Sequence, residues 1–534
     1  MATVAEDAPV IIAGGGLVGL STAMFLAQRG IQSLVIERLT EPSTLPRAAF
    51  FHMRTFELFR QAGIEDEVRA QSEKEFEPDG AIVAVESLAG KELAAFIPSL
   101  NEGVEALSPC RRWFVSQPGL EPILRRRARE IGARFVSGWE VFGAEQDDDG
   151  VSVMARDVSS GEVRSFRGRY LVDCEGAHSK VREQLGIQML GRGVFSNSIT
   201  IYLRAQLAPY LVGRNLSIIY ISNPTLGGFF RLEKGSSRGF LVVNTVGDPI
   251  ADPVAGANAA ADVSEARLVE LVRASAGDPE LEVEIEGCAR WRCTSDVAER
   301  LQQGRIFLAG DSAHLMPPNG GFGGNTGIHD AHNLAWKLDL VLRGAAGPGL
   351  LDTYDAERRP VGRFTVDQAY TRYVTRTAAY LKAKDPPPYE EDFRIELGYI
   401  YRSDAVLTEP GTPELHEDPH HSHGRPGARA PHLWLQHQGK RISTLDLLGQ
   451  GFVVFAGPDG GAWAEAARRA GAAAGAEVTV HQPGPEVAEA YGIGSSGASL
   501  IRPDGFVAWR ASTAPADPAA ALTDALNAVL MKAG

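Results

Sequence analysis

Residues 10–37 carry the pattern that most constrains how this chain folds. Residues 10–13 are an apolar run typical of a buried parallel strand, and residues 33–36 are a second such run that ends at Glu37. Between them lie the glycine-rich segment 14–19 and a stretch that we expect to be helical as far as residue 29. This order predicts the first strand–helix–strand unit of a doubly wound, Rossmann-like α/β domain.

The glycines of this segment suit a dinucleotide. Gly14 permits a tight turn, Gly16 lets the backbone approach a pyrophosphate, and Gly19 allows close packing of helix against strand. The helix N-terminus favours the negative charge of that pyrophosphate. Glu37 lies 18 residues after Gly19, where a ribose hydroxyl pair needs an acceptor, and Arg38 beside it is a further predicted cofactor contact. An acid here favours FAD or NAD over NADP.

A second glycine-rich element lies near the middle of the chain. Residues 305–309 are typical of another short buried strand, which leads into Gly310 and Asp311. Residues 316–325 follow, with two adjacent prolines and four glycines, and a helix is expected after them. We therefore expect a second set of backbone N–H groups to face a polar ligand.

With these two elements the chain resembles the FAD-dependent aromatic hydroxylases of the para-hydroxybenzoate hydroxylase type. It is most similar to the bacterial hydroxylases of aromatic polyketides such as anthracyclines and angucyclines, above all over residues 10–37, 305–338 and 424–510. The resemblance implies a monooxygenase in antibiotic biosynthesis that uses FAD, NADPH or NADH, and O₂. It would hydroxylate a polycyclic aromatic substrate through a flavin C4a-hydroperoxide.

The resemblance also implies cofactor contacts. Asp311 would bind the ribitol of FAD, Arg47 would contact the flavin, and Gln117 would lie near the cofactor. The residues expected to line the flavin ring are Pro318, Gly321, Gly323, Gly324 and Asn325.

One segment departs from the family pattern. The family motif Gly-Ala-Asp-Gly is replaced here by residues 173–176, so that Asp173 stands for the first glycine and Glu175 for the aspartate. In the family this segment also serves NADPH. The departure therefore bears on the route of the reductant more than on FAD binding.

Two residues are candidates for holding or activating a phenol. A cation near a phenol oxygen favours the phenolate, and Arg376 and Tyr220 are the candidates for this task. A large apolar site is expected, and no charged anchor for a single-ring substrate stands out, which favours a polycyclic one. Phe229, Phe230, Trp291 and Trp113 are candidates for its walls, and an ordinary core position is the alternative for each.

The predicted layout has four parts. They are a discontinuous FAD-binding domain (1–75, 106–180 and 290–350), a substrate-binding β-sheet domain (76–105 and 181–289), a helix and linker (351–424), and a C-terminal domain (425–534). Alternating apolar runs predict an antiparallel sheet over 195–247, and a long helix is expected over 352–382. By resemblance the last domain is thioredoxin-like, without redox cysteines.

Composition and charge argue against several classes of binding partner. The net charge of −14 argues against nucleic acid and against an anionic membrane surface. Residues 9–27 are uncharged, but they are short and interrupted by glycines, so we expect no membrane anchor. Four cysteines without a C-x-x-C pair favour a cytoplasmic protein. Whether the chain forms a homodimer is a separate question that stays open here. Residues 420–423 contain three histidines, but their spacing matches no metal site, so no metal is expected.

Three alternatives stay open. The first glycine motif alone would also suit an NAD-dependent dehydrogenase, although the second motif would then be superfluous. The altered motif at 173–176 allows a non-catalytic flavin-binding protein. The same flavin site could instead perform Baeyer–Villiger insertion, epoxidation or ring-opening oxidation.

Overall fold

The structure is a computed structural model that describes residues 7–41, 49–378, 381 and 386–532. Strands from distant parts of the chain form one six-stranded sheet, which is parallel except at the edge where residues 302–303 pair with residues 306–307. Its order is β17 (Gln302–Gln303), β18 (Ile306–Leu308), β11 (Tyr170–Asp173), β1 (Val10–Ala13), β2 (Ser33–Glu37) and β7 (Arg134–Ser137). Together with the helices around it, this sheet makes the fold mixed α/β.

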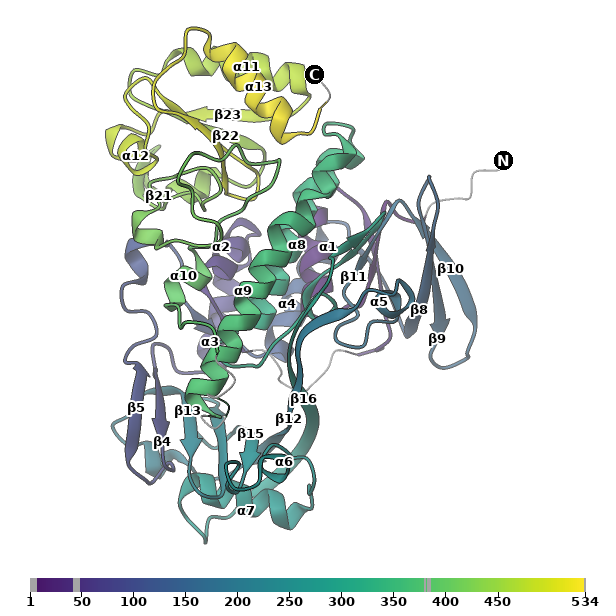
Figure 1. Cartoon of the computed structure of the whole chain (residues 1–534), viewed down its shortest axis with the longest axis vertical. Helices are drawn as coiled ribbons and strands as arrows, with labels where there is room; N and C mark the ends of the chain where they lie inside the picture. The colour runs from purple at the N-terminus through teal and green to yellow at the C-terminus, as the bar shows by residue number, and fades with distance from the viewer. Residues whose placement is uncertain (1–6, 42–48, 379–380, 382–385, 533–534) are drawn as a thin grey trace.

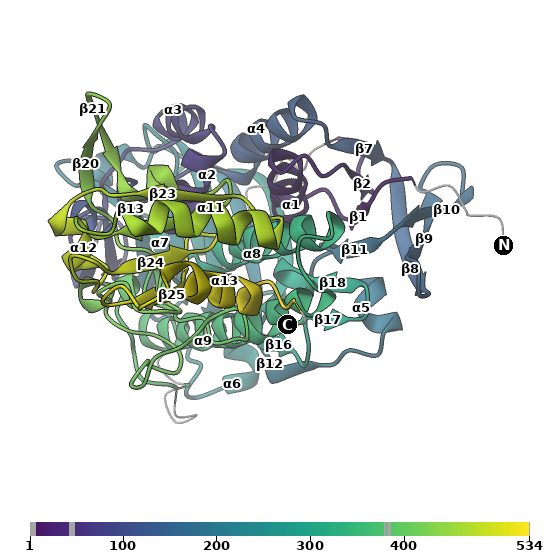
Figure 2. The same ribbon diagram turned by 90° about the horizontal axis from the view of Figure 1, so that it is seen from above.

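Three helices pack beside this sheet. Helix α1 (Leu17–Gln28) contacts both α4 (Gln117–Glu130) and α8 (Phe322–Leu342), as Figure 2 shows from above. The predicted strand, helix and strand over 10–37 are confirmed as β1, α1 and β2. A Cβ atom on Gly19 would lie 1.9 Å from the carbonyl oxygen of Gly14. Only glycine therefore allows α1 to pack this closely against the turn.

An eight-stranded sheet forms the lower end of the molecule in Figure 1. Its order is β19 (His314–Leu315), β16 (Glu284–Ala298), β12 (Met189–Arg204), β15 (Arg238–Val246), β14 (Leu226–Leu232), β13 (Leu216–Ser222), β4 (Ala81–Val85) and β5 (Glu92–Ile97). The predicted antiparallel sheet is present, but β13 and β4 pair in parallel, so the sheet is mixed. A segment of more than a hundred residues joins these two strands, which gives it room for the crossover that parallel neighbours need.

The two faces of this sheet differ. One face packs against α7 (Glu265–Ala276) with aliphatic side chains, and the other carries a cluster rich in aromatic rings. A separate three-stranded sheet, β8 (Trp139–Gln146), β9 (Val151–Asp157) and β10 (Val163–Gly168), lies at one side and was not predicted.

Helix α9 (Thr353–Arg376) connects the middle of the molecule with the aromatic face. It ends six residues before the predicted end at 382, and Arg376 is its last residue. Among the described residues, no helix is long and apolar enough to cross a membrane.

The C-terminal part is a four-stranded sheet at the end opposite the eight-stranded sheet (Figure 1). Its order is β23 (Val478–His481), β22 (Phe452–Ala456), β24 (Ala498–Ile501) and β25 (Val507–Ala511), with α11 (Ala462–Ala474) packed against α13 (Pro518–Val529). The hairpin expected over 498–509 is confirmed as β24 and β25.

Candidate functional site

The carboxyl ends of β1 and β2 meet at the glycine turn. Glu37 accepts hydrogen bonds from the backbone N–H of Gly15 (2.5 Å) and of Leu39 (2.8 Å), so its carboxylate lies over the turn. The side chain of Arg38 is exposed beyond it. The predicted acceptor is thus at the nucleotide end of the turn.

Helix α4 brings a second segment to the same place. A Cβ atom on Gly16 would find only the Oε1 atom of Glu121 nearby, at 3.8 Å, so the space beside Gly16 is open. Gln117 donates from Nε2 to that same oxygen at 2.6 Å. The structure therefore places Gln117 close to Gly16, and Glu121 is a neighbour that the sequence did not indicate.

The second glycine motif lies against α1. Gly310 has a φ of +66°, and a Cβ atom there would lie 2.7 Å from the side chain of Val18. Asp330 in α8 accepts hydrogen bonds from the Gly310 N–H (3.1 Å) and from His314 (2.7 Å). Asp311 follows with an exposed side chain. Helix α1, this turn and α8 thus converge, and Asp330, which was not predicted, fixes the turn.

The loop before α8 ends in two glycines with positive φ, Gly320 (+90°) and Gly321 (+71°). Gly323 and Gly324 then lie in the first turn of the helix, where backbone N–H groups lack helical acceptors. A Cβ atom on Gly323 would contact only Met316, at 3.8 Å. Pro318, in the same loop, is exposed.

The side chain of Asn325 is fully hydrogen-bonded inside the protein. Its Nδ2 donates to the carbonyls of Phe50 (3.0 Å) and Gly321 (2.7 Å), and its Oδ1 accepts from the His52 N–H (2.9 Å) and the Thr55 hydroxyl (2.6 Å). The side chain thus joins the start of α2 (Met53–Gln61) to α8. Only the backbone of Asn325 is left for a flavin.

These features fit FAD. Open space beside Gly16 and Gly323, which any larger side chain would fill, lies at the first turns of two helices. One N-terminus suits a pyrophosphate and the other a flavin ring that carries partial negative charge. Arg47, the predicted flavin contact, lies outside the described residues.

The altered motif places two carboxyl groups side by side. Ser179 donates from Oγ to Asp173 (2.5 Å), and the geometry also permits a bond to Glu175 (3.3 Å). Burial raises the pKa of Asp173 to about 6, and burial and the charge of Asp173 raise the pKa of Glu175 to about 8. The pair therefore retains a proton near neutral pH, which limits the negative charge beside the glycine turn that follows β1.

Tyr220 and Arg376 lie near the loop of residues 316–321 that precedes α8, which we call the flavin loop. Asn319 of that loop donates from Nδ2 toward the Tyr220 hydroxyl (3.4 Å) and to Thr377 Oγ1 (3.1 Å). The guanidinium carbon of Arg376 lies 4.8 Å from the ring centre of Phe96 and 5.9 Å from that of Tyr220. The two predicted residues are thus neighbours, and Asn319 joins them to the loop.

Arg376 is charged although it is buried. Burial lowers its pKa, but the Tyr220 hydroxyl, Asp392 and Tyr389 more than offset this, so that the pKa lies above its ordinary value. Its Nη2 donates to the Tyr389 hydroxyl at 3.1 Å. A permanent cation therefore stands beside the Tyr220 ring.

Aromatic side chains cover the sheet around this pair. Phe229 lies 5.6 Å from Tyr220 between ring centres, and Trp291 packs at the edge of the same cluster. Two of the candidate walls are core positions instead. Phe230 alternates to the opposite face, where it packs with α7, and Trp113 is buried in the core beside the six-stranded sheet.

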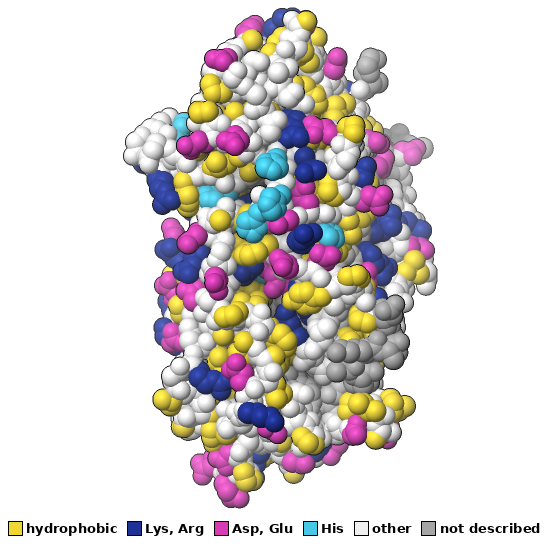
Figure 3. Space-filling model, turned by 60° about the vertical axis from the view of Figure 1, so that its left-hand side comes forward, with side chains coloured by type: hydrophobic (Ala, Val, Ile, Leu, Met, Phe, Trp, Pro, Cys, Tyr) yellow, Lys and Arg dark blue, Asp and Glu magenta, His cyan; other side chains and the backbone are white. Residues whose placement is uncertain are grey.

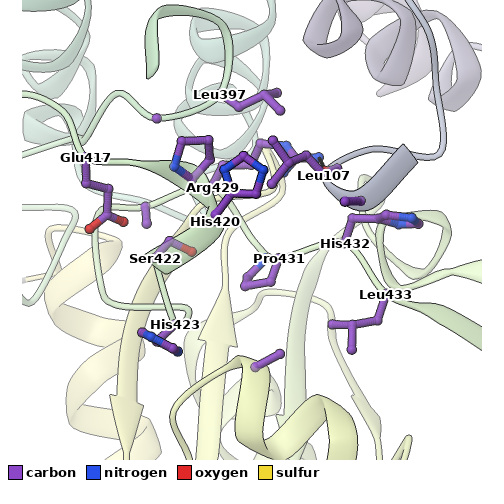
Figure 4. A pocket seen from close by; sticks show the side chains of 15 residues that line it. Leu107, Leu397, Glu417, His420, Ser422, His423, Arg429, Pro431, His432 and Leu433 are labelled. Atoms are coloured by element: carbon purple, nitrogen blue, oxygen red, sulfur yellow. Dashed lines mark hydrogen bonds between the residues drawn. The ribbon is translucent and has the colours of Figure 1, made fainter. Parts of the chain in front are cut away.

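A separate cavity of about 200 Å³ lies between the linker and the C-terminal part (Figure 4). Leu107, Leu397, Glu417 and His432 are among the residues that line it, and the flavin-loop and nucleotide residues described above are not.

Figure 3 shows histidine side chains gathered on one face of the molecule. In the part of the chain that the structure describes, no group of three or more His, Cys, Asp or Glu side chains could hold a metal ion.

Comparisons with known proteins agree with this geometry. The family described as "FAD binding domain" matches residues 7–369, and the family "Aromatic-ring hydroxylase, C-terminal" matches residues 423–533. A 4-methyl-5-nitrocatechol 5-monooxygenase of Burkholderia sp is 49% identical over 98% of both chains. A tetracenomycin A2 monooxygenase-dioxygenase of Streptomyces glaucescens is 38% identical over 99% of this chain and 97% of its own.

Solved structures give the same result. A ternary complex of aklavinone-11 hydroxylase with FAD and aklavinone superimposes with a TM-score of 0.92 at 36% identity, over 99% of this chain and 100% of the other. The flavin-dependent monooxygenase PieE, in complex with FAD and substrate, gives a TM-score of 0.86 at 32% identity over 99% of this chain and 100% of its own.

Proposed function

This chain belongs to the family of FAD-binding aromatic-ring hydroxylases, and from that premise we propose that it hydroxylates a phenolic polycyclic aromatic compound of the polyketide type. One observation carries the proposal. Asn319 joins the loop at the start of α8 to Tyr220, which lies beside the cation Arg376 on an aromatic sheet face. The relatives that act on tetracenomycin and aklavinone support the substrate class.

The chain's residues would divide the work as follows. The first turn of α1 and Glu37 would hold the adenosine and pyrophosphate of FAD, and Asp311 and the first turn of α8 would hold the ribitol and ring. When bound, FAD supplies the redox chemistry with O₂. The face around Phe229 would exclude water and align the substrate ring against it.

Tyr220 and Arg376 would act on the phenol. A guanidinium and a hydroxyl next to the phenol oxygen stabilise the phenolate, which makes the ring more electron-rich. Asn319 would keep the Tyr220 hydroxyl oriented, because its amide donates toward that oxygen. Neither group is a base, so the pair would lower the pKa of the phenol and the released proton would pass to water.

A nicotinamide reductant, NADPH or NADH, completes the proposal. The retained proton of the Asp173–Glu175 pair makes this segment less repulsive to anionic nucleotides than two free carboxylates would be. A thioredoxin-like C-terminal domain, the domain boundaries given above, a cytoplasmic location and a homodimer stay predictions.

One observation favours a second candidate substrate. The relative that is 49% identical along nearly its whole length is named for a single-ring nitrocatechol. A single-ring catechol is therefore the alternative to a polycyclic substrate at the same site.

Product mass tests the proposal. FAD-loaded protein, NADPH or NADH, and ¹⁸O₂ are mixed with 1,8-dihydroxyanthraquinone or with catechol. We expect one product to gain a single labelled oxygen, and the better substrate decides between the two classes. Reductant consumption that gives hydrogen peroxide with every phenol, and no labelled product, would refute hydroxylation.

A further inference from the structure

Arg231 in β14 is a buried cation that the proposed mechanism does not use. The residue is 4% exposed, and its guanidinium lies between two rings, 3.9 Å from the centre of Phe76 and 3.8 Å from that of Phe114. Among the described residues it forms no ion pair. Glu75, the acid that most favours its charge, is already bonded to the Ser116 N–H and to Gln71.

The hydrogen bonds of Arg231 use only one side of the guanidinium. Nη1 donates to the carbonyl of Ser217 at 2.6 Å, whereas Nε and Nη2 have no partner among the described residues. Nε and Nη2 form one edge with two parallel N–H donors. That edge is the one that binds a planar pair of oxygens in a bidentate manner.

Such an arrangement is costly for a fold. Burial lowers the pKa of Arg231 to about 9, and Glu75 and Glu233 do not offset this. Buried polar groups in proteins almost always have partners, so two open donors on one buried edge call for an explanation. A ligand that supplies the missing acceptors is the explanation that the chemistry of the edge suggests.

Arg231 lies on the aromatic face of the eight-stranded sheet, to which we assign the substrate. It lies two residues after Phe229 on the same face of β14, which corresponds to about 7 Å along the strand. Phe114 stacks on Phe50 with ring centres 4.7 Å apart. A Cβ atom on Gly321, in the flavin loop, would lie about 3 Å from Phe50. Arg231 thus contacts Phe76 and Phe114 of the aromatic cluster, whereas Arg376 contacts Phe96 and Tyr220.

We propose that the Nε and Nη2 edge of Arg231 binds a planar pair of acceptor oxygens on the aromatic substrate, as a nitro or a carboxylate group provides. This inference rests on the proposed function and narrows its substrate class. Arg231 would hold the substituted end of the ring while Tyr220 and Arg376 hold the phenol oxygen. The sequence showed no such anchor because an arginine in a strand is ordinarily an exposed residue.

The test compares three probes with FAD-loaded protein: 4-nitrocatechol, 3,4-dihydroxybenzoate and catechol. Binding is followed by the change in the visible flavin spectrum. We expect wild type to bind at least one of the first two at least 10-fold more tightly than catechol, and the preferred probe identifies nitro or carboxylate as the group. Arg231→Met should abolish the difference, and Arg231→Lys should restore part of it.

The melting temperature separates binding from a structural role. Methionine packs well against aromatic rings and removes an uncompensated charge, so Arg231→Met should melt at the wild-type temperature or above it. Arg204→Met, at an exposed ion pair on β12, is the matched control and should keep the preference. If Arg231→Met keeps the 10-fold preference, or if wild type binds all three probes equally, the inference is wrong.

Failure of the proposed function would look different. In that case no phenol gains oxygen in the ¹⁸O₂ experiment, whatever the binding preference shows. A wild-type preference that Arg231→Met removes would then still establish the binding edge.

Discussion

Two regions of this molecule bury charge in opposite ways. Between α8, α9 and the turn after β24, Glu357 accepts from Lys337 (2.8 Å) and from both terminal nitrogens of Arg502 (2.5 and 2.9 Å), and Arg502 also bonds Asp504. Both cations of this buried network have acids as partners. On the aromatic face, Arg231 is equally buried but has no acid partner among the described residues.

The difference shows what each region is for. Buried charges that find partners inside the chain hold elements together, and here they attach the C-terminal part to α9 and, through Glu357, to α8. Buried charges with open donors await partners from outside. The first region should therefore respond to mutation in stability and the second in binding and catalysis.

The largest effect is expected from Glu357→Gln. It leaves Lys337 and Arg502 buried with only Asp504 to balance them, and breaking such a group costs about 3–5 kcal/mol. Urea unfolding of the FAD-loaded protein measures this. Glu465→Gln, at an exposed pair with Arg468, should leave the free energy of unfolding nearly unchanged. Equal effects of the two variants would show that the network does not stabilise the fold.

Tyr220→Phe tests the other region. Loss of a hydroxyl that faces a phenolate should lower kcat/KM for hydroxylation about 10–100-fold, the worth of a hydrogen bond to a charged group. The melting temperature should change little, because inside the protein the hydroxyl loses only its long contact with Asn319 and its interaction with Arg376. Tyr210→Phe, which removes a hydroxyl bonded to Asp278 away from the site, is the control. Unchanged turnover in Tyr220→Phe would remove Tyr220 from the mechanism.

Asp173→Asn examines a third case, two like charges held together. The folded-state pKa values of Asp173 (about 6) and Glu175 (about 8) lie above those of the unfolded chain, about 4. Their contribution to stability is therefore full below about pH 4 and is lost as the pH rises through 6 to 8. Asparagine keeps an acceptor for the Glu175 N–H, and its amide can donate to the Ser179 hydroxyl in place of the hydrogen bond that Asp173 accepts from it.

We expect Asp173→Asn to gain stability over wild type from pH 5 to pH 9, by about 1–3 kcal/mol at the alkaline end. Thermal melts of the FAD-loaded protein across this range measure it. Asp149→Asn, at an exposed position, should follow the wild-type profile. A difference that stays constant with pH would show that the two carboxyl groups do not share a proton.

The sequence predicted the nucleotide end better than the substrate end, and the reason is physical. Gly14, Gly16, Gly19 and Glu37 act through local backbone geometry, so their spacing along the chain is sufficient. Phe229 and Phe230 differ only in which face of a strand they occupy, and the apolar run around them does not tell the faces apart. Likewise, Nε and Nη2 of Arg231 lack partners because of how the chain packs around them, and the sequence does not show that packing.

The smallest effect is expected at Gly323, in the first turn of α8. Alanine there has space in the protein and suits a helix, so the FAD-free fold should gain about 0.5–1 kcal/mol. The same methyl group would enter the space assigned to the flavin, so the Kd for FAD should rise several-fold. Gly461→Ala is the matched control, because it has open space and a helical conformation at the start of α11, away from the site. A stability gain in both variants with weaker FAD binding in Gly323→Ala alone would show that the glycine is kept for the ligand, as the open donors of Arg231 are. If Gly323→Ala binds FAD as tightly as wild type, the ring does not lie against this turn.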